Sequence, residues 1–203
     1  MKSDCTIDFS EPTTRQELLD SLSSMHALAT RFWDGLPLEY FFTPFREKWS
    51  PAENVLHLNK STRPVALALR LPMIVPRLLF GSSNEPSRSY SQILLAYHEA
   101  LSKGGQAGSY APIRREFPPD PQEVRDKIMR HWNQTWQQLI RAANHWDDQS
   151  LDRLCLPHPL LGKLSIREML YFTLYHHLHH LQIVAARISD GNSMQAETKL
   201  QSG

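Results

Sequence analysis

Apolar residues recur every three or four positions over residues 14–33, a spacing that gives an α-helix one apolar face. Gly35 and Pro37 follow this stretch and are residues that end helices. We therefore expect a first helix from about Thr14 to Trp33. Its apolar positions are Leu18, Leu19, Leu22, Met25, Leu28, Ala29 and Phe32.

Capping sequences mark the starts of three further helices. Ser50-Pro51-Ala52-Glu53 and Asp120-Pro121-Gln122-Glu123 each combine a capping side chain, a proline suited to the first turn and a glutamate three residues after the cap. Ser165 is followed by Glu168 in the same relationship. We expect these helices to run to about residues 62, 146 and 188. Pro64 would kink or end the first of them, and Gly191 would end the last.

The connections between these helices predict the topology. Residues 71–89 are rich in Pro, Ser and Gly, and they predict a long irregular crossover. A shorter helix is expected at about 90–103, followed by a loop over 106–119. The chain shows no strand alternation and no glycine-rich phosphate-binding loop. These features predict an all-α four-helix bundle with one additional short helix, formed by residues 1–203 as a single domain with flexible ends at about 1–12 and 192–203.

Composition narrows the class of protein. The 203 residues carry 22 Lys and Arg against 21 Asp and Glu, a formal charge of +1. We therefore expect no nucleic-acid partner, because phosphate binding relies on an excess of cationic side chains. Only Cys5 and Cys155 are present, and the N-terminus has no apolar signal segment. The apolar stretch at 65–80 contains two Arg and two Pro residues, so no membrane span is expected. Together these features predict a cytoplasmic protein.

Four of the ten histidines lie within five residues, at His176, His177, His179 and His180. Helical side chains four residues apart share a face, which allows two imidazoles to bind one ion. His176 and His180 have this spacing, whereas His177/His180 and His176/His179 are three apart. A helical wheel does not separate His176 from His177 as a ligand. Such histidines can also be solvated or hydrogen-bonded in a core, so spacing alone leaves both interpretations open.

Three segments, in order, resemble the DinB/YfiT-like family of metal-dependent enzymes. The segment from Trp49 to Leu58 contains a helix cap and a histidine eight positions after the tryptophan. The loop from Gly104 to Ala107, followed by Pro112, also resembles this family. The segment from His158 to Glu168 resembles the family's entry to its last long helix, which carries a His-xxx-His pair. The resemblance covers most of the chain.

The resemblance implies an up-down-down-up bundle in which His57 joins His176 and His180 to bind one divalent transition metal, such as Zn, Ni or Fe. One tension is that a helical wheel places His57 off the centre of its apolar stripe. Three imidazoles leave coordination positions open, which is typical of catalytic sites. Characterised branches of the family are S-transferases or isomerases that use bacillithiol, mycothiol or glutathione. The chain is therefore expected to act on a small molecule as a thiol-dependent S-transferase or a hydrolase, and to pair as a homodimer. The alternative is a non-catalytic, stress-linked scaffold protein with a vestigial histidine cluster.

Other chemically active side chains are predicted to have structural roles. Glu53 is expected to cap its helix, or otherwise to support a ligand histidine. No residue stands out as a general base. Packing or loop positions are expected for Tyr175, His98, His131, His145, His158, Cys155, Trp132, Trp136 and Trp146.

Overall fold

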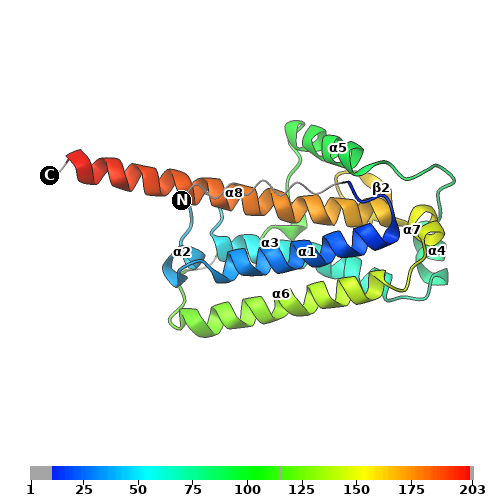
Figure 1. Cartoon of the computed structure of the whole chain (residues 1–203), viewed down its shortest axis with the longest axis horizontal. Coiled ribbons are helices and arrows are strands. Elements are labelled where there is room, and N and C mark those ends of the chain that lie inside the picture. Colours follow the sequence, from blue (N-terminus) through cyan, green and yellow to red (C-terminus); the bar gives the residue numbers. More distant parts are fainter. Residues whose placement is uncertain (1–10, 115, 202–203) are drawn as a thin grey trace.

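The computed structural model describes residues 11–114 and 116–201, and four long helices dominate it. These are α1 (Arg15–Asp34), α3 (Pro51–Leu69), α6 (Pro121–Ala143) and α8 (Ile166–Gln201). They lie side by side, with α1 and α8 running in one direction and α3 and α6 in the other (Figure 1). This is the four-helix bundle that the sequence predicts, in its up-down-down-up topology.

Local capping explains where the long helices begin. Thr14 and Ser50 each form a capping box with the glutamate three residues later. Asp120 caps α6 through a bond from the Glu123 backbone, with Pro121 in the first turn. Of the residues expected on the apolar face of α1, Leu18, Leu19, Leu22, Met25 and Ala29 are buried, whereas Leu28 and Phe32 are half-buried. Capping thus sets the helix starts, and apolar burial sets which face turns inward.

The predicted helix ends differ from the observed ones. Pro64 lies inside α3, which continues to Leu69. A proline has no backbone N–H, so the carbonyl of Lys60, four residues before Pro64, has no helical partner. Both residues are exposed, so water can donate to that carbonyl. The helix α6 ends at Ala143, and α8 continues past Gly191 to Gln201. Glycine lowers helix stability by only about 1 kcal/mol, and no proline follows to stop the helix.

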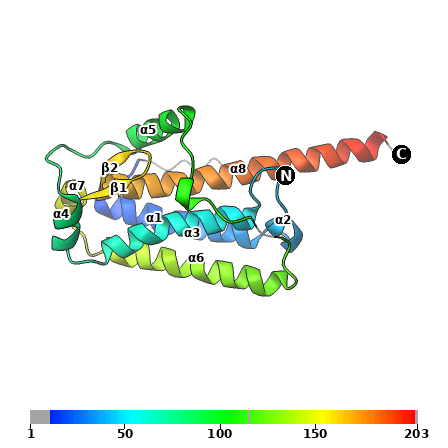
Figure 2. The same ribbon diagram turned by 180° about the vertical axis from the view of Figure 1, so that it is seen from behind.

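A long crossover connects α3 to α6 and covers one side of the bundle. The expected short helix is α5 (Tyr90–Ser102), and a 3₁₀ turn, η1 (Gly108–Tyr110), follows it. Figure 2 shows α5 beside α8, and η1 beside α3. The segment expected to be irregular at 71–89 contains another helix, α4 (Ile74–Phe80), which has no side-chain cap and therefore no cap signal in the sequence.

Two further helices and two strands lie outside the predicted set. The short helices α2 (Leu38–Phe42) and α7 (Asp148–Arg153) adjoin the bundle ends. An antiparallel hairpin of β1 (Cys155–His158) and β2 (Gly162–Ser165) leads into α8, with Leu156 opposite Leu164 and His158 opposite Gly162. Buried and exposed residues do not alternate along these two strands, so the sequence carries no strand pattern here. Gly162 adopts a left-handed φ of 73°, which a glycine accommodates without strain.

The core between the helices is aromatic. Trp33, Trp132 and Trp136 are its largest fully buried side chains, and Trp146 donates from Nε1 to the Leu69 carbonyl at 2.9 Å. Trp132, Trp136 and Trp146 pack in the core as the sequence predicts. Cys155 is a buried free thiol, whereas Cys5 and most of the expected tail at 1–12 lie outside the described residues. No helix in the described part of the chain is both long and apolar enough to cross a membrane.

Candidate metal centre

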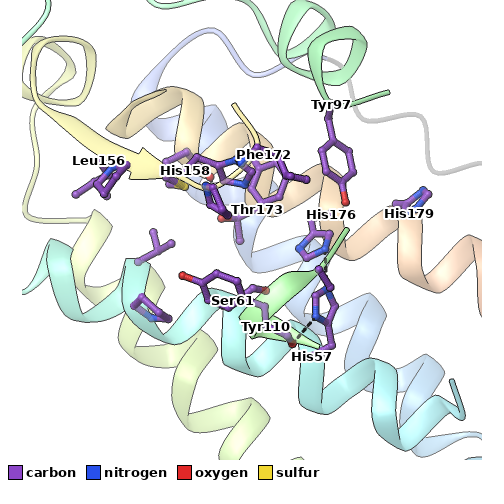
Figure 3. Close-up of a pocket in the computed structure, with 18 of the residues that line it drawn as sticks. His57, Ser61, Tyr97, Tyr110, Leu156, His158, Phe172, Thr173, His176 and His179 are labelled. Carbon is purple, nitrogen blue, oxygen red and sulfur yellow. Dashed lines mark hydrogen bonds between the residues drawn. The ribbon is translucent and has the colours of Figure 1, made fainter. Parts of the chain in front are cut away.

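Three histidines from two helices meet inside the bundle. His57 comes from α3, and His176 and His180 come from successive turns of α8; all three are buried. His57 Nε2 lies 3.0 Å from His176 Nε2, and one ring nitrogen of each histidine lies within 4.8 Å of the others. Figure 3 shows His57 and His176 facing each other across the gap between the helices. The structure therefore brings together the three histidines that the family resemblance implied.

Neighbouring oxygen atoms fix the orientation of two of these rings. His57 Nδ1 donates to the Tyr110 carbonyl at 2.9 Å, and His180 Nδ1 donates to Asn54 Oδ1 at 2.7 Å. In a neutral imidazole with the proton on Nδ1, the lone pair is on Nε2. The Nε2 atoms of His57 and His180 are thus available as metal ligands. Bonds of this kind to the second ring nitrogen are typical of metal-binding histidines.

Burial keeps the three rings uncharged. Burial lowers the pKa of His57, although the hydrogen bond to the Tyr110 carbonyl acts in the opposite direction. The pKa values of His176 and His180 lie well below their usual range, first because the rings are buried and then because the histidines repel one another's charge. Neutral imidazole is the form that binds a metal ion.

The donor set fits a divalent transition metal. Two imidazole nitrogens that each lie about 2.0–2.1 Å from one ion are themselves separated by roughly 2.8–3.4 Å at angles between 90° and 109°. The distance of 3.0 Å between His57 and His176 is in this range. Borderline nitrogen donors suit ions such as Zn²⁺, Ni²⁺ or Fe²⁺. The three histidines could therefore hold one such ion.

His177 has a different environment from His176. Its Nδ1 donates to the Thr173 carbonyl at 2.7 Å, and its Nε2 lies 3.4 Å from the Thr62 hydroxyl, which can donate to it. Its ring packs against Trp136 with a centroid separation of 4.7 Å. Burial lowers its pKa to about 3. Both ring nitrogens of His177 thus have partners within the core, and it is the His176 ring that faces His57.

The remaining candidates have the structural roles that the sequence suggested, with one exception. Glu53 accepts from the Ser50 backbone and caps α3. Tyr175 is buried, and its hydroxyl lies 2.6 Å from His98 Nε2. His131 is exposed, and His145 donates from Nδ1 to the Arg141 carbonyl. The exception is His158, which lines a cavity.

This cavity opens beside the three histidines and has a volume of about 360 Å³. Its walls come from α3, the end of α4, α5, η1, the hairpin and α8, and they are mostly apolar. Trp49 also lines it, stacked on His180 with a ring separation of 6.2 Å. A concave apolar site with a few polar groups is typical of small-molecule binding.

The sequence interpretation missed several residues of this site. Asn54 orients His180. It lies three residues before His57, and this spacing could have indicated that both side chains lie on the same face of the helix. Tyr110 contributes a backbone carbonyl, which any residue type could supply, so no sequence signal existed. Tyr97 comes from α5 and also lines the cavity.

Comparisons with known proteins agree with this architecture. The family model of the DinB superfamily matches residues 21–184. Among solved structures, the crystal structure of TT2238, a four-helix bundle protein, is similar with a TM-score of 0.54 and 17% identity, over 85% of this chain and 99% of that chain. The crystal structure of the colibactin self-resistance protein ClbS in complex with a dsDNA gives a TM-score of 0.45 and 13% identity, over 87% of this chain and 96% of that chain. No curated protein matches the chain.

The expectation that nucleic acid is not a partner is withdrawn. It rested on the formal charge alone, and ClbS, one of the similar structures, is in complex with a dsDNA. The formal charge of +1 is a sum over the whole chain, and it does not report how cationic side chains are distributed on the surface. Net charge alone therefore gives no basis for excluding nucleic acid.

Proposed function

Because the chain belongs to the DinB superfamily, we propose that it is a metal-dependent enzyme in which His57, His176 and His180 bind one divalent transition-metal ion. The observation that carries this proposal is the approach of His57 Nε2 and His176 Nε2 to 3.0 Å beside a cavity. The hydrogen bonds of His57 and His180 to Tyr110 and Asn54 support it, because they direct the Nε2 lone pairs inward.

The reaction we assign is transfer of a low-molecular-weight thiol to a small molecule. When bound, the ion supplies Lewis-acid chemistry, because it lowers the pKa of a thiol or water molecule that it coordinates. The apolar walls exclude water and hold the substrate beside the histidines. No carboxylate lies among the described residues that line the cavity. We choose thiol transfer over hydrolysis because the characterised branches of the family use low-molecular-weight thiols.

A second candidate function is a non-catalytic binding or scaffold protein. The favouring observation is that His57 Nε2 can accept a hydrogen bond from His176 Nε2 at 3.0 Å without any ion. Such a bond would leave the pair satisfied as part of the core. This candidate predicts that added divalent ions leave the melting temperature unchanged.

Elemental analysis of untagged protein, expressed without added metal, tests the proposal. We expect near one equivalent of one transition metal in the wild type and in the control His131→Ala, whose side chain is exposed. We expect loss of the metal in His180→Ala. The variants would then be assayed for thiol transfer with bacillithiol, mycothiol and glutathione.

The measured metal contents and activities distinguish between the ligand set, the reaction and the scaffold function. Stoichiometric metal in His180→Ala would overturn the ligand set. Metal-free wild type, with no rise in melting temperature on adding Zn²⁺, Ni²⁺ or Fe²⁺, would favour the scaffold function. Bound metal without transfer activity would overturn the assigned reaction and leave the metal site intact.

A further inference from the structure

The cavity walls carry no formal charge. Among the described lining residues there is no Lys, Arg, Asp or Glu, and apolar side chains such as Phe80, Leu101 and Met169 cover much of the surface. Moving an unpaired charged group from water into such surroundings is strongly unfavourable. The part of a ligand that fills this space is therefore uncharged and largely apolar.

His158 provides a polar group with a fixed direction at this wall. Its Nδ1 accepts hydrogen bonds from the backbone N–H groups of Leu160 at 3.2 Å and Leu161 at 3.1 Å. Burial lowers its pKa to about 4, so the ring is neutral at pH 7. Because Nδ1 is an acceptor, the single proton of the neutral ring is on Nε2.

The hairpin and α8 hold this ring in place. The His158 ring packs on Phe172 of α8 with a centroid separation of 4.2 Å, and Figure 3 shows the two side by side. In the described part of the chain, no residue accepts a hydrogen bond from His158 Nε2. The ring therefore presents a preorganised donor without a protein partner.

Tyr97 provides another neutral donor, at a different point. Its side chain reaches from α5 with the hydroxyl directed toward His176 (Figure 3). No described residue is hydrogen-bonded to this hydroxyl. Tyr97 thus lies beside the three histidines, whereas His158 lies beside Phe172 and Thr173.

We propose that the cavity takes an uncharged, mainly apolar substrate with a hydrogen-bond acceptor such as a carbonyl oxygen, and that His158 Nε2–H binds this acceptor. The inference rests on the proposed function, because it names the substrate class of the same site. His158 is a binding residue in this scheme, and it sets which end of the substrate faces the histidine cluster. A cavity of about 360 Å³ suits a small organic molecule.

Matched probe molecules test this proposal. Acetophenone and α-methylstyrene have nearly the same shape, but only acetophenone carries a carbonyl acceptor, and benzoate adds a negative charge. Dissociation constants would be measured by ligand-observed NMR on the full chain, as purified and after dialysis against EDTA. We expect acetophenone to bind about threefold to tenfold more tightly than α-methylstyrene, as one net hydrogen bond allows. Benzoate should bind the dialysed protein more weakly than either.

Two substitutions test the roles of the two ring nitrogens of His158 independently. His158→Asn retains an acceptor near the Nδ1 position and removes the Nε2–H donor, whereas His158→Gln retains a donor near Nε2 and loses the acceptor. We expect the preference for acetophenone to disappear in His158→Asn and to persist in His158→Gln. Circular dichroism would confirm that both variants fold. Binding of acetophenone and α-methylstyrene to Tyr97→Phe reports whether the hydroxyl of Tyr97, and not His158, is the donor.

The outcomes distinguish this proposal from the metal site. Equal binding of the two neutral probes to the wild type, or no binding of either, would overturn the substrate class. Loss of the preference in Tyr97→Phe but not in His158→Asn would overturn the role of His158. Because the probes are also tested on EDTA-dialysed protein, a failure of the metal assignment would leave these results unchanged.

Discussion

Asn54 Oδ1 accepts a hydrogen bond from His180 Nδ1 at 2.7 Å, while Asn54 Nδ2 donates to the Ser50 carbonyl at 2.8 Å. The bond to Ser50 determines which atom of the amide faces His180. The proton of His180 is therefore on Nδ1, and its Nε2 faces the histidine cluster as an acceptor. The first turn of α3 thus orients a ring that belongs to α8.

Removing this contact should weaken metal binding without removing a ligand. We expect Asn54→Leu to lower the affinity for Zn²⁺ by about 10- to 100-fold, because His180 loses the acceptor that orients it. Asn54→Asp keeps an oxygen acceptor and should bind Zn²⁺ at least as tightly as the wild type. Competition with a chromophoric chelator measures both affinities. Equal affinity in Asn54→Leu and the wild type would show that this bond has no part in metal binding.

Neighbouring histidines on α8 should respond differently to substitution. His177→Leu removes the ring that packs on Trp136 and leaves the Thr62 hydroxyl without its acceptor, so we expect the free energy of unfolding to fall by about 1–3 kcal/mol. The metal content of His177→Leu should equal that of the wild type. His176→Leu should abolish stoichiometric metal and leave a folded protein.

Urea denaturation and elemental analysis of the two variants check this prediction. Loss of metal from a folded His177→Leu protein would reverse the assignment of the two residues.

The long helices could be predicted from the sequence because their signals are local. The capping boxes at Ser50 and Ser165 form as expected, with the glutamate side chain bonded to the backbone of the cap residue. The hairpin could not be predicted, because buried and exposed residues do not alternate along its strands. The strands are held by pairing with each other and by packing against α4 and α8. Elements stabilised by tertiary contacts leave little local trace.

The candidate site was predictable only in part. The spacing of the α8 histidines was visible in the sequence. Whether His176 or His177 faces His57, however, depends on which neighbours each ring contacts in the folded chain. The helical wheel placed His57 off the centre of its apolar stripe, yet the residue is buried, because η1 of the crossover covers that side of α3. A wheel describes one helix, and it cannot include a covering segment from elsewhere in the chain.

Arg125 stabilises the end of α1 from its position on α6. Its guanidinium donates to the carbonyls of Trp33 at 2.8 Å, Leu36 at 2.6 Å and Asp34, and it lies over the Phe41 ring at 5.1 Å. We expect Arg125→Met to lower the free energy of unfolding by about 2–4 kcal/mol, because one buried and two half-buried carbonyls lose their donor.

Arg125→Lys is the matched control for this prediction. It keeps the charge, but a single ammonium lacks the fork of donors that serves several carbonyls, so it should recover only part of the loss. Urea denaturation measures both variants, and metal content should be unaffected. A change below about 0.5 kcal/mol in Arg125→Met, the size usual for surface substitutions, would contradict this role.

Glu168 makes the stability of the α8 entry depend on pH. Its carboxylate accepts from the Arg88 backbone at 2.8 Å, from Arg88 Nε at 2.9 Å and from the Ser165 backbone at 3.0 Å. Burial acts to raise the pKa of Glu168, but these bonds and the Arg88 charge outweigh it and lower the pKa below the usual 4.5. The folded state therefore binds the proton of Glu168 less readily than the unfolded state does.

A lowered pKa stabilises the fold above the unfolded pKa, and this contribution is lost as the pH falls through the folded pKa. Glu168→Gln has nearly the same shape and cannot ionise. We expect it to lower the free energy of unfolding by about 1–3 kcal/mol at pH 7. The difference from the wild type should shrink as the pH falls below about 4.5, where Glu168 of the unfolded chain takes up a proton, and it should be lost once the pH has passed the lower pKa of the folded state. Urea denaturation of the wild type and of Glu168→Gln between pH 7 and pH 3 measures this difference in the free energy of unfolding. A difference that stays constant over this range would show that the ionised carboxylate is not the stabilising form.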